Sequence, residues 1–172
     1  MLPAYAANAL PVVFNRFNLF SFLAKPVDFN KRLFGKPLFG HSKTFRGFIV
    51  GIGGGIIVGI IQYFLSSISG IQNISLIDYS LLNSFYVGFL LSIGALLGDL
   101  IKSFLKRRIG ISSGNSWLIF DQIDYAVGAL ILVSLVVIPS YPHIIAIITI
   151  SAFFSVFANI FAYLCGIKKV WW

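Results

Sequence analysis

Long apolar runs separated by short polar stretches are the feature that most constrains this chain. Crossing a bilayer takes about 20 residues of helix, and five segments qualify, at about 2–23, 45–68, 78–98, 119–138 and 142–166. Only helices and closed barrels satisfy their backbone in lipid, and these runs lack the short alternation of barrel strands. The sequence therefore predicts an all-α integral membrane protein with five transmembrane helices, forming a single domain over residues 1–172.

The basic residues alternate between the two ends of these spans. Of the 13 Lys and Arg residues, six lie in the connection 25–46, four in 99–121 and two after 166, while 66–80 and 139–142 hold none. Under the positive-inside rule, this predicts an outside N-terminus, a cytoplasmic C-terminus and two long basic cytoplasmic loops in the cell membrane. Because the net charge of +8 is concentrated next to the spans, we expect phosphorylated substrates and the lipid bilayer as partners, and no nucleic acid.

Acidic residues are rare and unevenly placed. All five are aspartates, and Asp99, Asp121 and Asp124 lie where the third span ends and the fourth begins. Acidic residues favour helix N-termini, which explains Asp121, but Asp124 lies deeper in an apolar helix and needs a lysine or a metal as its partner. Oxygen ligands with no His or Cys nearby favour Mg²⁺ or Mn²⁺ over zinc. We therefore expect one or more of these ions at the cytoplasmic face.

Basic and hydroxyl side chains accompany the first of these aspartates. If the third span continues as a helix, Asp99, Lys102, Ser103 and Lys106 share one face, because they lie at offsets of 0, 3, 4 and 7. A solvated helix end, whose cations favour the C-terminal dipole, is the alternative explanation for Lys106, Arg107 and Arg108. That alternative does not explain a carboxylate at position 99.

A basic loop, residues 35–47, is predicted on the same side of the membrane. Its glycines allow close backbone approach to a ligand, and Lys43 and Arg46 are candidates for holding a triphosphate, with Thr44 as a hydrogen-bonding group. Binding of anionic lipid headgroups explains the same basic residues equally well. Asp28, earlier in the same connection, is expected to serve as a turn or cap residue.

Glycines recur at four-residue spacing in the second and third spans, at positions 51, 55 and 59 and at 94 and 98. This spacing is typical of close helix packing in membranes. We expect these faces to pack the second span against the third, which would bring the loop containing Lys43 near Asp99.

The stretch 98–108 and the pair Asp121 and Asp124 are similar to the signature of the CDP-diacylglycerol synthase superfamily, the CTP-dependent cytidylyltransferases of membrane lipids. That signature is an Asp-x-x-x-Ser-x-x-Lys-Arg stretch followed by a loop and an Asp-x-x-Asp pair. The Asp-Gln-x-Asp form, the short length and the stretches 6–12 and 40–47 resemble the archaeal branch, the CDP-archaeol synthases. The Gly-His-Gly-Gly box of bacterial and eukaryotic members is replaced here by Ser-Gly-Asn-Ser-Trp at 113–117.

The resemblance implies transfer of CMP from CTP to 2,3-di-O-geranylgeranylglyceryl phosphate, an isoprenoid ether-lipid phosphate. The products are CDP-2,3-di-O-geranylgeranylglycerol and pyrophosphate. The candidate catalytic residues are Asp99, Lys102, Asp121 and Asp124, with the three aspartates as metal ligands. The candidate substrate- and phosphate-binding residues are Lys43, Thr44, Arg46, Ser103, Lys106 and Arg107.

Other functions stay open at this point. Composition does not distinguish isoprenoid from acyl tails, so phosphatidic acid is the alternative lipid substrate. A small divalent-cation transporter would use the same aspartates as a pathway, although the acids gather at one surface. A non-catalytic lipid-binding subunit would use the basic loops but would not need three neighbouring aspartates. The sequence does not indicate the oligomeric state.

Overall fold

The computed structural model describes residues 1–68 and 80–170, and this part of the chain is mostly helical. The elements in chain order are α1 (Leu2–Arg16), the 3-10 helix η1 (Ser21–Leu23), β1 (Arg32–Leu33), β2 (Lys36–Pro37), α2 (Phe45–Ser66), α3 (Leu81–Arg108), α4 (Leu118–Val133) and α5 (Tyr141–Leu164). The two short strands form an antiparallel hairpin within the connection between α1 and α2. The prediction of a helical protein is therefore confirmed.

Three of these helices are long and apolar enough to cross a membrane, namely α2, α3 from Asn83 onward, and α5. Helices α1 and α4 have 15 and 16 residues, fewer than the about 20 that a straight crossing takes. The predicted count of five crossings therefore stays a prediction. The predicted start of the third span, at residue 78, lies outside the described residues.

Helices α1, α3 and α4 end at different places from those predicted; α4 ends at Val133, before the predicted residue 138. The first two differences have a local reason. Helix α1 ends at Arg16, before the predicted residue 23, because Asn18 and Phe20 adopt positive φ angles of 52° and 50° that a right-handed helix does not allow. Helix α3 continues past residue 98 to Arg108. The basic residues in its last turn favour this extension because they lie at the negative end of the helix dipole.

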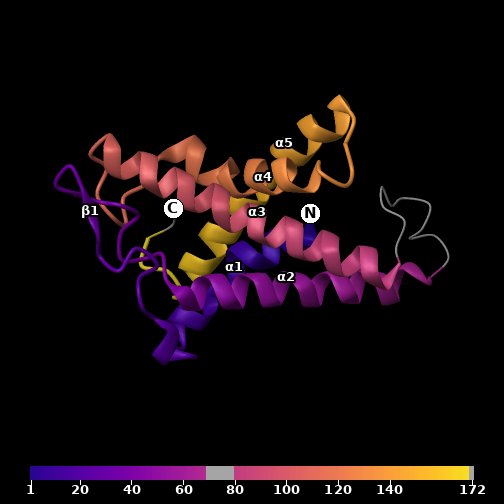
Figure 1. The fold of residues 1–172 in the computed structure, drawn as a ribbon, viewed down its shortest axis with the longest axis horizontal. Helices are drawn as coiled ribbons and strands as arrows, with labels where there is room; N and C mark the ends of the chain where they lie inside the picture. The colour runs from indigo at the N-terminus through magenta and orange to yellow at the C-terminus, as the bar shows by residue number, and fades with distance from the viewer. Residues whose placement is uncertain (69–79, 171–172) are drawn as a thin grey trace.

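Helix α3 lies at the centre of the bundle, in contact with α1, α2 and α4, while α5 contacts mainly α4. Figure 1 shows α2 and α3 side by side along the long axis of the molecule. The buried core consists mainly of small and medium-sized side chains from three helices: Ala4 and Ala7 of α1, Val87, Leu91 and Ala95 of α3, and Tyr125, Ala126, Ala129 and Val133 of α4. Small side chains allow the helix backbones to approach closely.

The glycines of the third span do not pack where the sequence predicted. A Cβ atom on Gly98 would lie 2.3 Å from the backbone oxygen of Asp124, and one on Gly94 would lie 2.5 Å from the backbone oxygen of Gly128. Both glycines therefore face α4, and the expectation that they pack against the second span is wrong. Spacing shows that a glycine face exists, but the rotation of the helix decides which neighbour it meets.

The second span does pack against the third through its glycines, as predicted. A Cβ atom on Gly59 would lie 2.6 Å from the backbone oxygen of Ser84, and one on Gly55 would lie 2.8 Å from the Cβ atom of Ser92. The partners supplied by α3 are thus Ser84, Gly88 and Ser92, which all precede the glycines that face α4.

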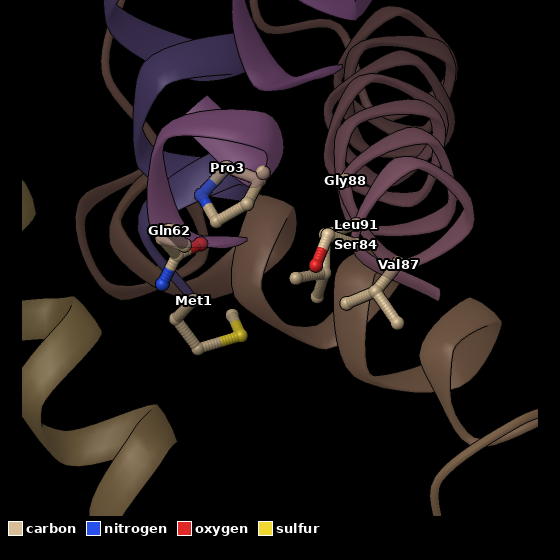
Figure 2. Close-up of a pocket in the computed structure, with 8 residues that line it drawn as sticks. Met1, Pro3, Gln62, Ser84, Val87, Gly88 and Leu91 are labelled. Atoms are coloured by element: carbon tan, nitrogen blue, oxygen red, sulfur yellow. The ribbon is translucent and has the colours of Figure 1, made fainter. Parts of the chain in front are cut away.

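The two ends of the bundle differ in character. At one end, the connection between α1 and α2, the end of α3 and the start of α2 lie together (Figure 1). At the other end, a small pocket lies between the start of α1, the later part of α2 and the start of α3 (Figure 2). The pocket is lined by the uncharged side chains of Met1, Pro3, Gln62, Ser84, Val87 and Leu91 and by Gly59 and Gly88.

Candidate functional site

Three of the five aspartates converge on a single ammonium group. Lys102 Nζ lies 3.0 Å from Asp99 Oδ1, 2.9 Å from Asp121 Oδ1 and 2.9 Å from Asp124 Oδ2. The predicted juxtaposition of the three carboxylates is therefore present. The carboxylates come from the C-terminal part of α3, which is predicted to be cytoplasmic, and from the first turns of α4.

Two further lysines complete the group. Lys43 pairs with the second carboxylate oxygen of Asp99, and Lys106 Nζ lies 3.1 and 3.0 Å from the two oxygens of Asp121. Lys106 also donates to the backbone carbonyl of Asn115, at 2.6 Å. We call Asp99, Asp121, Asp124, Lys43, Lys102 and Lys106 the aspartate–lysine cluster. Its three carboxylates and three ammonium groups balance in charge.

Local structure explains why these side chains meet. Asp99, Lys102 and Lys106 share one face of α3, because residues three or four apart are neighbours on a helix. At the start of α4, the Asp121 carboxylate accepts a hydrogen bond from the Trp117 backbone N–H, so Asp121 also caps this helix as the sequence allowed. The backbone contact at Gly98 holds α3 and α4 close at the level of Asp124.

The cluster is largely shielded from water. The side chain of Asp124 is 7% exposed and that of Lys102 is 14% exposed. Ion pairs in such surroundings are screened less than surface pairs. Removing one partner of a buried pair leaves an uncompensated charge, which is strongly destabilising.

Three predicted phosphate-binding side chains are engaged in structural hydrogen bonds. Thr44 caps α2, where its hydroxyl accepts from the Gly47 backbone N–H at 3.2 Å. The Ser103 hydroxyl donates to the Asp99 backbone carbonyl, one turn earlier, at 2.7 Å. Arg46 is buried and donates to the backbone carbonyl of Leu19 at 3.1 Å and to the side chain of an asparagine at the end of α1. Arg46 therefore ties α2 to the segment after α1 and does not join the aspartate–lysine cluster.

Arg107 is the predicted phosphate-binding residue whose guanidinium is least engaged. Its side chain is buried, and its Nε atom has no hydrogen-bond partner among the described residues. A Cβ atom on Gly40 would lie 3.9 Å from this Nε atom and 3.3 Å from the hydroxyl oxygen of Ser113. Arg107 thus lies where the two loops before α2 and α4 meet.

The connection before α2 is organised by a buried carboxylate that the sequence predicted to be a turn residue. Asp28 accepts hydrogen bonds from the backbone N–H groups of Asn30 at 2.9 Å, Phe39 at 3.0 Å and Gly40 at 3.3 Å. The neck of the connection is closed by a bridge between Pro26 and Thr44. The turn that carries Lys43 towards Asp99 is thus held by the hydrogen bonds of Asp28. The prediction that Asp28 is a turn residue is confirmed.

The end of α3 holds the hairpin of this connection. The Arg108 guanidinium donates to the backbone carbonyls of Leu33, Lys36 and Pro37, and Lys36 Nζ donates back to the Arg108 carbonyl at 2.9 Å. Sequence reasoning attributed Arg108 only to a basic helix end. Its role in loop anchoring depends on a contact between positions more than 70 residues apart, which no local pattern reveals.

A lysine from the C-terminal segment lies within electrostatic reach of the cluster. Lys168 donates to Asn159 Oδ1 of α5 at 2.6 Å. Burial lowers the pKa of Lys168, and the charges of Lys102, Asp121, Lys43 and Asp99 also influence it. From the sequence, the tail was predicted to be cytoplasmic. One sequence feature could have indicated this proximity, because Lys168 and Lys169 follow the last span on the side predicted for the aspartates. Residues 171 and 172 lie outside the described residues.

The cluster offers the right atoms for a divalent metal but holds them around a lysine. Asp99, Asp121 and Asp124 supply only carboxylate oxygens, the donors that Mg²⁺ and Mn²⁺ prefer. Each places one oxygen within 3.0 Å of a common point, which is Lys102 Nζ. In residues 1–68 and 80–170, no group of three or more His, Cys, Asp or Glu residues is arranged to hold a metal ion as it stands. The donor set fits a divalent metal by its chemistry, and the Lys102 ammonium lies at the point between the three oxygens.

Comparison with known protein sequences gives matches along the whole chain. A family model described as CarS-like, CDP-archaeol synthase, matches residues 1–172. A CDP-archaeol synthase of Methanocaldococcus jannaschii is 37% identical over 173 residues, which cover 100% of this chain and 93% of that protein. A CDP-archaeol synthase of Methanococcus vannielii is 41% identical over 173 residues, with the same coverage.

A solved structure supports the same relationship. It belongs to an intramembrane enzyme for archaeal membrane lipids biosynthesis and superposes with a TM-score of 0.76 at 29% sequence identity. The superposition covers 93% of this chain and 90% of that one. The helical arrangement described above is therefore that of an enzyme embedded in the membrane.

Proposed function

The chain belongs to the CDP-archaeol synthase family, and we propose that it transfers CMP from CTP to 2,3-di-O-geranylgeranylglyceryl phosphate. The products are CDP-2,3-di-O-geranylgeranylglycerol, also called CDP-archaeol, and pyrophosphate. The observation that carries this proposal is the full-length match to CDP-archaeol synthases. The aspartate–lysine cluster, at one end of a bundle with membrane-spanning helices, supplies the matching chemistry.

The reaction places few demands on proton transfer. An oxygen of the lipid phosphate attacks the α-phosphorus of CTP and forms a new P–O bond, while the bond to the β-phosphate oxygen breaks and pyrophosphate leaves. The attacking phosphate is already an anion, so it needs no protein base. The difficulty is to bring two polyanions together, which positioning and electrostatic stabilisation can achieve.

The side chains have distinct roles in this proposal. Lys43, Lys106 and Arg107 contact the phosphates, the lysines as point charges and the arginine as a planar fork. Support for Arg107 comes from its burial and from the Nε atom that has no partner in the described part of the chain. Thr44, Ser103 and Arg46 now have a secondary role, because their structural hydrogen bonds position Lys43 and Asp99.

We propose that Asp99, Asp121 and Asp124 hold Mg²⁺, with Mn²⁺ as an alternative. A divalent ion bound there would neutralise phosphate charge during the transfer. The protein contributes a carboxylate set that is preassembled on two closely packed helices. The lipid would enter from the side, with its tails along the helices and its phosphate at the interface.

For the membrane arrangement, we propose five crossings, with the N-terminus outside and the cluster at the cytoplasmic face. The support is the alternation of basic residues along the chain. Ser42 is exposed, so a Ser42→Cys variant that also carries Cys165→Ala tests this arrangement. In intact cells, an impermeant thiol reagent should leave position 42 unlabelled until the cells are broken; labelling from outside would reverse the orientation.

The central experiment is a pyrophosphate-release assay on the detergent-purified protein with CTP and Mg²⁺. It compares the geranylgeranyl ether-lipid phosphate, phosphatidic acid and no lipid, and ATP replaces CTP in a parallel series. We expect release that depends on the ether lipid and prefers CTP. Release with phosphatidic acid alone would move the protein to the acyl-lipid branch. The absence of release with either lipid, in protein shown to be folded, would overturn the proposal.

A further inference from the structure

Lys102 differs from every other cation of the cluster in the number of its partners. Its Nζ atom lies within 3.0 Å of one oxygen from each of the three aspartates. Lys43 pairs with Asp99 alone and Lys106 with Asp121 alone. Among the described residues, Lys102 is also the one cation paired with Asp124, the least exposed of the three carboxylates.

The position of this ammonium is the position expected for a metal ion. Three carboxylates brought together in a shielded site repel one another unless a cation lies between them. A lysine ammonium is a compact point charge on a flexible four-carbon stem, so it can fill that position and can also leave it. A divalent cation seeks the same oxygens, and two cations do not share one point.

We propose that Lys102 is a built-in counter-ion, which holds the three carboxylates in place without metal and moves out of their centre when a divalent cation binds. This inference rests on the proposed metal site and, for what the ammonium meets afterwards, on the proposed reaction with substrate phosphates. The central position of Lys102 among the three carboxylates supports the displacement.

The exchange has a consequence for the charge of the site. With Lys102 at the centre, three carboxylates balance three ammonium groups, so the cluster offers little net attraction to an anion. Adding a divalent cation while all three lysines remain nearby gives the cluster a charge of about +2. A triphosphate is thus attracted mainly to the metal-loaded protein, and the released ammonium is available to it.

The test measures metal binding directly. Mn²⁺ is titrated into the purified full-length protein without nucleotide or lipid, and free Mn²⁺ is followed by electron paramagnetic resonance. We expect Lys102→Met to bind Mn²⁺ roughly tenfold or more tightly than the wild type, because the competing charge is gone. Lys106→Met is the matched control, because it also removes one ammonium group from the cluster but one that contacts a single aspartate.

The control separates displacement from a general charge effect. Lys106→Met should tighten Mn²⁺ binding by a clearly smaller factor. Lys25→Met changes an exposed lysine in the connection between α1 and α2 and should leave Mn²⁺ binding unchanged. Equal gains in Lys102→Met and Lys106→Met, or no gain in Lys102→Met, would overturn the inference.

A second measurement uses the wild-type protein, so it does not depend on the folding of a variant. Lysines are modified with an amine reagent with and without Mg²⁺, and the modified peptides are quantified by mass spectrometry. Mg²⁺ should raise the labelling of Lys102 and leave that of Lys25 unchanged. Unchanged or lower labelling of Lys102, under conditions where Mn²⁺ binding is measured, would overturn the inference. A wild-type protein that shows these effects but transfers no CMP would overturn the proposed function instead.

Discussion

Helix α3 packs against α2 and against α4 through small residues, and the two contacts differ in the charge of the side chains beside them. Near its start, Ser84 meets Gly59 of α2, beside a pocket with uncharged lining side chains. Further along, Gly98 meets the backbone of Asp124 in α4. In both places an added Cβ atom would clash with the backbone of the neighbouring helix, but only the second contact lies at the aspartate–lysine cluster.

This difference separates packing from chemistry. Close approach through glycine is a general way to join helices in a membrane, and the contact between Gly59 and Ser84 lies beside uncharged side chains. At the α3–α4 contact the same geometry fixes the distance between carboxylates from two helices. A small-residue face becomes part of a site only where charged side chains flank it.

The largest expected effect comes from a change that keeps the shape of the α3–α4 contact and removes one charge. Asp124→Asn should lower CMP transfer by about 100-fold or more, because electrostatic groups of an active site are typically worth that much. The pyrophosphate-release assay gives the rate, and thermal unfolding shows whether the protein is folded. Retention of more than half of the wild-type rate would contradict the assigned role of Asp124.

A matched pair of glycine variants tests the comparison itself. A Cβ atom on Gly98 would lie 2.3 Å from a backbone oxygen of α4, and one on Gly59 would lie 2.6 Å from a backbone oxygen of α3. Both alanine variants should therefore lose about 1–3 kcal/mol of stability through overpacking. Gly98→Ala should in addition lose about 10- to 100-fold in transfer rate, because small misplacements of catalytic groups are that costly.

Gly59→Ala is the control in this pair, and it should retain a rate close to wild type at a temperature where it is folded. Thermal unfolding and turnover measured on the same preparations check both statements. Equal losses of rate in the two variants would show that activity follows overall packing and not the position of Asp124.

The smallest effect is expected at the end of the bundle that holds the pocket with uncharged lining side chains. The hydroxyl of Ser84 is buried and has no hydrogen-bond partner among residues 1–68 and 80–170, and an unsatisfied buried polar group is unfavourable. Ser84→Ala should therefore leave stability unchanged or raise it by up to about 1 kcal/mol, with no change in rate. Thermal unfolding measures this shift, and a clear loss of activity would mean that the end of the bundle with this pocket takes part in the reaction.

Much of the site was accessible from the sequence because it depends on local order. Helical spacing placed Asp99, Lys102 and Lys106 on one face, and the boundary between two apolar runs placed Asp121 and Asp124 opposite them. The turn role of Asp28 also followed from its surroundings in the chain. These features need only the helix period and the positions where apolar runs end.

The features that were missed depend on the rotation of helices or on distant contacts. Spacing alone does not show that Gly94 and Gly98 face α4, since the same spacing fits any neighbour. The binding of Arg46 to the segment after α1 requires that α1 end at Arg16, and the apolar run itself continues beyond that point. The influence of the cluster on Lys168 requires the tail to lie next to the cluster, which the tail composition does not reveal.

The length of α3 has a consequence for the membrane around the protein. Its 28 residues form one uninterrupted helix, about 42 Å long at 1.5 Å per residue, whereas the hydrocarbon core is about 30 Å thick. The rigid length of this helix would fix the distance between the Asp99 carboxylate and the middle of the bilayer. A thicker bilayer would draw this carboxylate towards hydrocarbon and a thinner one would lift it into water.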